Sequence, residues 1–216
     1  MSATSIGKLA SKASGRTRGL YLDDAWAWSR SQADALRRRD IDAIDWENVI
    51  EEIEDVGNRH SDAWASHCRN VISNLLKIEH SGAAEAVDHC RKEIVAWRRE
   101  MYGKLYENPG MKSSLTELLD RAWRLGRGDA VQALAEQAGP EDWVAGKRGL
   151  RGWQGRLPLE CPYSLEEIVG YDPVDKRAEP EPDVWPASVA RRLNEKLGRG
   201  YPVPHRAPEP ESGRSR

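Results

Sequence analysis

Apolar residues recur along most of this chain at steps of three and four positions, the spacing that gathers side chains on one face of an α-helix. The spacing predicts five amphipathic segments, each with one buried face. Their apolar stripes are Leu22, Ala25, Trp26, Ala33 and Leu36; Trp46, Val49, Ile50, Ile53 and Val56; Trp64, Cys68, Val71, Ile72, Leu75, Leu76 and Ile78; Val87, Cys90, Ile94, Trp97, Met101 and Leu105; and Leu115, Leu118, Leu119, Ala122, Leu125, Ala130, Ala133 and Leu134. No stretch of strand length alternates apolar with polar residues. We therefore expect an all-α fold, an antiparallel helical bundle of four to five main helices with a short C-terminal helix and disordered ends.

Three local signals refine this picture. Gly57-Asn58 interrupts the second stripe, so that helix either ends there or kinks and continues. Residues 139–160 contain five glycines and are interpreted as a surface loop pinned by Trp143 and Trp153. Ser164 and Glu167 have the spacing of a capping box, which predicts the start of the short C-terminal helix.

The two ends differ from the middle. Residues 1–19 carry four basic residues and no acid, with few large apolar side chains, and are expected to form a flexible basic arm. Residues 172–216 hold eight of the twelve prolines and are interpreted as a largely disordered tail, with a short helix at 186–198. Residues 20–171 are the expected helical bundle domain.

Composition and charge exclude several classes of protein. The chain has 216 residues, 31% of them charged, and a net charge of −2. Residues 20–171 carry 20 Lys and Arg against 27 Asp and Glu, an acidic balance that disfavours nucleic-acid binding. No apolar run is long enough to cross a membrane, and no secretory signal is evident. Three cysteines are too few for a disulfide scaffold, which favours a cytoplasmic protein.

Several motifs together resemble one family. The segment Asp45-Trp46-Glu47-Asn48-Val49-Ile50-Glu51-Glu52-Ile53-Glu54-Asp55-Val56-Gly57 resembles the signature of the bacterial domain of unknown function family 29. The Leu75-Leu76-Lys77 run, the Asn108-Pro109-Gly110-Met111-Lys112 break and the Cys161–Ile168 segment follow in the order expected for that family. Asn74 departs from the pattern, since the family has His before Leu-Leu-Lys. The resemblance implies a compact helical bundle in a bacterial protein, and it implies no established activity.

One cluster of residues has the character of a site. Glu47, Glu51 and Glu54 fall within about 60° of one another on a helix, so their carboxylates form an acidic row. One interpretation is that the row binds a divalent metal together with His60, as glutamates and histidines do in the cores of some helical bundles. The other is that it is a solvated face paired with arginines on another helix. Arg98 and Arg99 are the expected partners in the second case.

These observations favour a non-enzymatic protein–protein interaction module. The residues expected to carry the interaction are Trp46, Glu51, Glu54, Cys161, Pro162 and Tyr163. No catalytic residue and no cofactor are predicted, and the expected partner is another protein or a second copy of the chain. One alternative is a metal-dependent enzyme that uses Glu47, Glu51 and Glu54 with His60. A second alternative is a nucleic-acid accessory protein that uses the basic arm and the tail.

Overall fold

The computed structural model of the protein describes residues 20–139, 143–175 and 177–203. The predicted basic arm, residues 1–19, lies outside the described residues. The chain divides into two compact units, one ending at Arg59 and the other beginning at His60. We call them the hairpin unit and the body, and each is described by itself.

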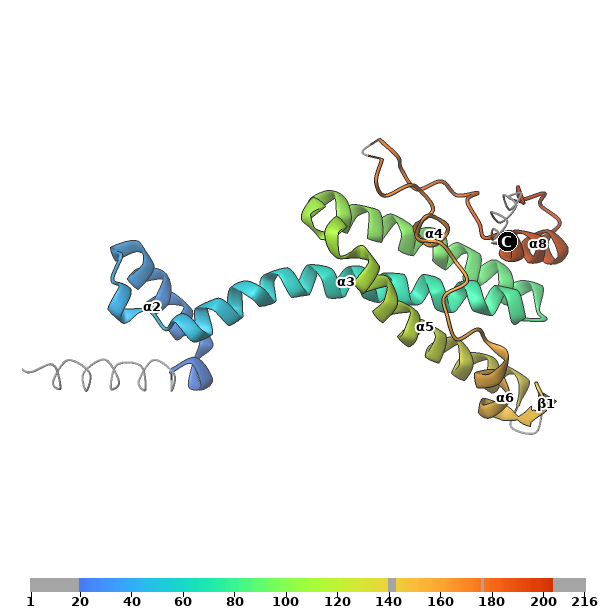
Figure 1. Ribbon diagram of the computed structural model, residues 1–216, viewed down its shortest axis with the longest axis horizontal. Helices are drawn as coiled ribbons and strands as arrows, with labels where there is room; N and C mark the ends of the chain where they lie inside the picture. The colour runs from blue at the N-terminus through green and yellow to red at the C-terminus, as the bar shows by residue number, and fades with distance from the viewer. Residues whose placement is uncertain (1–19, 140–142, 176, 204–216) are drawn as a thin grey trace, which may run out of the picture. The chain divides into compact units, whose positions relative to one another are not determined.

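The hairpin unit consists of helix α2 (Ala25–Arg38), the 3₁₀ turn η1 (Ile41–Ala43) and the first part of α3 (Trp46–His80) (Figure 1). The Asp24 carboxylate caps α2 by accepting from the Ala27 N–H. Asp45 then joins the two helices, because its N–H donates to the Gln32 side chain at 2.7 Å and its carboxylate accepts from the Trp28 indole at 3.3 Å. These contacts fix how the two helices of the hairpin pack.

Helix α3 is continuous from Trp46 to His80 and passes from the hairpin unit into the body. The expected interruption at Gly57-Asn58 is absent. No atom outside the helix would touch a Cβ at Gly57, so the glycine marks no tight contact. An isolated glycine lowers helix stability by about 1 kcal/mol, which a helix of this length tolerates.

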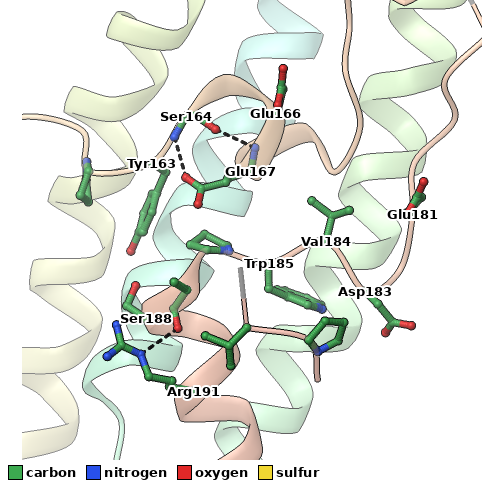
Figure 2. Close-up of a pocket in the computed structure, with 15 residues that line it drawn as sticks. Tyr163, Ser164, Glu166, Glu167, Glu181, Asp183, Val184, Trp185, Ser188 and Arg191 are labelled. Atoms are coloured by element: carbon green, nitrogen blue, oxygen red, sulfur yellow. Dashed lines mark hydrogen bonds between the residues drawn. The ribbon is translucent and has the colours of Figure 1, made fainter. Parts of the chain in front are cut away.

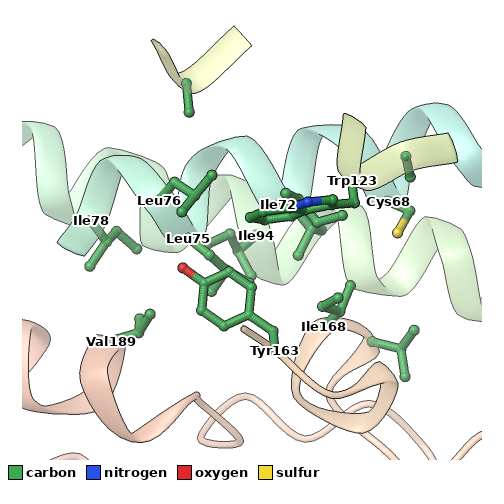
Figure 3. Close-up of a cluster of buried hydrophobic side chains, with 14 of the residues drawn as sticks. Cys68, Ile72, Leu75, Leu76, Ile78, Ile94, Trp123, Tyr163, Ile168 and Val189 are labelled. Atoms are coloured by element: carbon green, nitrogen blue, oxygen red, sulfur yellow. The ribbon is translucent and has the colours of Figure 1, made fainter. Parts of the chain in front are cut away.

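The body is built on three long helices: the second part of α3, α4 (Ala84–Glu107) and α5 (Leu115–Ala138), with the 3₁₀ segment η2 (Pro109–Ser114) before α5. Ser81–Ala83 make the short turn between α3 and α4, which run antiparallel, and the Asn74 amide donates to Glu93 of α4 at 2.9 Å. Buried side chains from all three helices form one hydrophobic core (Figure 3). Ile72, Leu75 and Ile94 are fully buried at its centre, as the predicted stripes require.

Residues 143–169 are more ordered than the predicted surface loop. They form a two-stranded antiparallel hairpin, β1 (Trp143–Val144) with β2 (Lys147–Arg148), then α6 (Gly149–Arg156) and α7 (Leu165–Val169). Trp153 is buried in the core, as expected of a pinning residue, whereas Trp143 is exposed. The capping box is confirmed: the Ser164 side chain accepts from the Glu167 N–H, and the Glu167 carboxylate accepts from the Ser164 N–H.

The tail also packs on the body over its described part. Helix α8 (Ala187–Leu197) lies along α4 (Figure 1), close to the expected 186–198. Trp185, Val189 and Leu193 have no exposed surface, so residues 177–203 differ from the expected largely disordered tail. The reason is the apolar content of this short segment, which outweighs the prolines around it. The secondary structure of the described residues is otherwise helical, which confirms the all-α fold class.

Candidate interaction surfaces

The apolar stripe of α3 is covered over only half of its length. From Trp64 to Ile78 the stripe is buried in the body core, as predicted. In the hairpin unit the prediction was wrong for four of the five residues, since only Val49 is buried. The others are exposed: Trp46, Ile50, Ile53 and Val56. The physical reason is that α2 packs on a different side of α3, the side of Asn48 and Val49, and leaves the stripe bare.

Helix α2 likewise buries a different face from the apolar stripe that the sequence predicts. Its buried residues are Trp28, Gln32 and Ala35, which face α3. The stripe found in the sequence lies about 110° further round the helix, given 100° per residue, and its large side chains remain exposed. Trp26 is 74% exposed and Leu36 is 46% exposed. The guanidinium of Arg30 lies over the Trp26 ring, 5.8 Å from its centroid.

The two bare stripes lie on the same side of the hairpin. Helices α2 and α3 run in opposite directions, because Trp28 contacts Asp45 at the start of α3 while Tyr21, ahead of α2, donates to Glu52 two turns further along. In both helices the bare stripe is rotated from the buried face in the same sense. For antiparallel right-handed helices this rotation brings both stripes to one side. We call this surface the hairpin face; its residues are Trp26, Leu36, Trp46, Ile50 and Ile53.

The acidic row borders the hairpin face. Glu47, Glu51 and Glu54 are exposed on α3, beyond the bare stripe, and Glu51 and Glu54 make no ion pair within the described residues. Within the same residues, no three His, Cys, Asp or Glu side chains come close enough to hold a metal ion. His60 instead lies beside Asn108, with 3.4 Å between the ring nitrogen and the amide nitrogen. The candidates named for metal binding are therefore not brought together into a metal-binding group.

A second surface feature is a groove on the body, with a volume of about 1410 Å³. Its walls come from the segment before α7 and from residues 181–188 at the start of α8 (Figure 2). Pro162 and Pro202 give it apolar surface, while Glu166, Glu181 and Asp183 give it acidic groups. Pro162 and Tyr163, both predicted interaction residues, line this groove.

The residues around Cys161 are structural in character. Tyr163 is buried and packs edge-on against Trp123, with 6.4 Å between ring centroids. The Cys161 thiol donates to the Tyr163 carbonyl at 3.5 Å, and burial raises the pKa of that thiol. A reactive cysteine needs a lowered pKa, so Cys161 lacks the property of a nucleophile. These side chains hold the α7 segment on the body.

Sequence reasoning missed Arg98, which does not line the groove but bonds to the backbone of the segments that do. It is 1% exposed, and its guanidinium donates to three backbone carbonyls, those of Glu167 at 2.5 Å, Ile168 at 3.0 Å and Val184 at 2.7 Å. The prediction that Arg98 pairs with the acidic row was wrong, because these carbonyls occupy its donors. Burial lowers the pKa of Arg98 to about 9, so the group is charged at neutral pH. Its three bonds hold the two walls of the groove together.

Fold and surfaces together define an all-α protein whose hairpin unit carries an exposed apolar face. The chain belongs to the family described as Domain of unknown function DUF29, whose model matches residues 20–172. This confirms the resemblance drawn from the sequence motifs. Comparisons with curated proteins and with solved structures found no significant match. Among the described residues, no helix combines the length and the apolar character needed to cross a membrane.

Proposed function

We propose that this protein is a non-enzymatic protein–protein interaction module, and that the hairpin face is its binding surface. The observation that carries the proposal is the bare half of the α3 stripe. The same helix buries its stripe completely in the body and leaves it exposed in the hairpin unit. Folded proteins rarely leave contiguous apolar surface of this kind uncovered unless it binds something.

The composition of the hairpin face supports a protein partner. It contains two tryptophans, the residue type most enriched among the energetically dominant positions of interfaces. Its α3 residues, Trp46, Ile50 and Ile53, follow one another at steps of four and three, the pattern that packs against another helix. Charged residues lie at its edges, as in the rim of a protein interface. The groove on the body lacks a comparable regular pattern.

The metal-dependent alternative receives no such support. Glu47, Glu51 and Glu54 lie on one exposed helical face, and within the described residues no three His, Cys, Asp or Glu side chains come close enough to hold a metal ion. The nucleic-acid alternative depends on the basic arm and on the tail, of which residues 1–19 and 204–216 lie outside the described residues. We therefore propose neither function.

A site-specific photo-crosslinker tests the proposal in the host cell. Placed at Ile53, which is 67% exposed on the hairpin face, it should give one discrete crosslinked species on illumination. Placed at Leu159, which is 82% exposed on the body, it is the matched control and should give none. A crosslinked species whose partner is either another protein or a second copy supports the proposal. Equal crosslinking at both positions, or none at Ile53, contradicts it.

A further inference from the structure

We infer that the partner of the hairpin face is a second copy of this chain, and that two hairpin units join into an antiparallel four-helix bundle. The inference rests on the proposed function, since it names the partner of the same surface. It is argued from the size of the unit, from the geometry of its bare stripes and from the signs of charge at its two edges.

The hairpin unit buries little core within its described residues. That part, residues 20–59, has about forty residues, close to the size below which a fold needs a disulfide, a metal or association. Its three cysteine-free elements offer no disulfide, and its buried residues between α2 and α3 are few: Trp28, Gln32, Ala35, Asn48 and Val49. Two of these five are polar. Association is the remaining route to a core.

The geometry of the hairpin face suits a second hairpin. Its side chains come from two antiparallel helices and lie on one side of the pair, so that two such layers placed face to face make four helices around one apolar centre. The exposed side chains offer on the order of several hundred Å², comparable with the roughly 800 Å² per partner of a specific interface. In a dimer with two-fold symmetry, both copies contribute the same surface to the interface, so the hairpin face would contact its own counterpart.

Two hairpins can face each other about a two-fold axis that is either parallel or perpendicular to the helices, and charge favours the parallel axis. Arg30 and Arg37 lie on α2 at one edge of the hairpin face, where Arg37 also pairs with Asp34 of the same helix at 2.7 Å. Glu51 and Glu54 lie on α3 at the opposite edge. A two-fold axis parallel to the helices places α2 of one copy opposite α3 of the other, so each basic edge meets an acidic edge. An axis perpendicular to the helices would place the two acidic rows together, and like charges repel at that distance.

The first experiment measures mass in solution. Sedimentation equilibrium of the full chain should give twice the 24.3 kDa of one chain. Replacing both stripe residues, Ile50→Glu with Ile53→Glu, should weaken association at least about tenfold. The replaced residues are exposed, so the helical circular dichroism should be kept. The matched control, Leu159→Glu on the body, should remain dimeric. Wild-type protein that stays at 24.3 kDa at tens of micromolar would overturn the inference.

The second experiment tests the arrangement. The contact between Trp28 and Asp45 sets Ser29 and Trp46 at similar heights along the hairpin, so the α2-on-α3 pairing brings Ser29 of one copy near Trp46 of the other. A mixture of Ser29→Cys chains and Trp46→Cys chains should form disulfide-linked dimers on mild oxidation. Trp46→Cys alone should form few, and strong crosslinking of that variant alone overturns the arrangement. If the Ile53 photo-crosslink instead reaches a different protein while the chain is monomeric, the interaction function stands and self-association fails.

Discussion

The Arg98 guanidinium lies over the Trp185 ring, with 4.7 Å between the guanidinium carbon and the ring centroid. This contact joins α4 to the segment that leads into α8, 87 positions further along the chain. The aromatic face is the negative side of the ring quadrupole, so it stabilises the buried cation in place of a carboxylate. The three carbonyls that accept from Arg98 complete its environment.

Removing this cation should destabilise the body. Arg98→Met keeps the apolar length of the side chain but leaves the carbonyls of Glu167, Ile168 and Val184 without a donor. We expect the free energy of unfolding to fall by about 2–4 kcal/mol, measured by urea denaturation at neutral pH. The neighbouring Arg99 is exposed, so Arg99→Met is the control and should stay close to wild type. Equal stability of the two variants would show that the carbonyls need no donor from Arg98.

Two nearby glycines of α5 should respond in opposite directions to the same substitution. A Cβ at Gly126 would lie 2.6 Å from the Arg69 carbonyl oxygen of α3, whereas one at Gly128 would meet nothing within 4 Å. Gly126→Ala should therefore cost about 1–3 kcal/mol, because the two helices must separate. Gly128→Ala should stabilise by about 0.5–1 kcal/mol through helix propensity. Thermal unfolding of both variants checks the prediction, and a gain at Gly126 would contradict it.

His67 should make stability depend on pH. Its ring stacks on Trp97 at 5.1 Å between centroids, and burial lowers its pKa below the usual 6.5. The unfolded state therefore binds more protons in the window below pH 6.5, so the free energy of unfolding rises with pH through that window. His67→Phe should flatten the rise between pH 5 and 7.5, as urea denaturation at each pH would measure. A slope that stays the same in His67→Phe would refute the assignment.

The capping box at the start of α7 should contribute more to the free energy of unfolding than a serine that precedes a helix without capping it. Ser164→Ala removes an acceptor for the Glu167 N–H and should cost about 1 kcal/mol. Ser114 occupies the equivalent position before α5 but makes no capping hydrogen bond with its side chain, so Ser114→Ala is the matched control. Chemical denaturation of the two variants should separate them, and equal losses would mean that the box does not stabilise α7.

Periodicity predicted most of the helices because their stripes are long and regular. It placed Ile72, Leu75 and Ile94 in the core, and all three are buried. It failed at Ile50 and Ile53, because a stripe records that a face is apolar and not which element covers it. The choice between the two faces of α3 in the hairpin unit depends on Gln32 and Asp45, whose polar contacts are set by packing rather than by spacing.

The groove could not be assembled from the sequence for a related reason. Arg98 sits next to Trp97 within a predicted core stripe, and its charge argued for an exposed position. Arg98 is buried because backbone carbonyls of residues 167, 168 and 184 accept its hydrogen bonds in place of a counter-ion. The sequence around residue 98 contains no pattern that predicts these distant acceptors. Ser164 and Glu167, by contrast, interact within one turn, and their contact was predicted correctly.

The family match ends at residue 172, yet Trp185, Val189 and Leu193 of the body core lie beyond it. During synthesis these side chains leave the ribosome after every helix against which they pack. The body therefore reaches its complete packing only after residues 185–193 have emerged, although domains often begin to fold from the N-terminal side. A nascent chain that stops at residue 172 would present Arg98 without Val184 or Trp185, and quality-control proteases would meet an opened core.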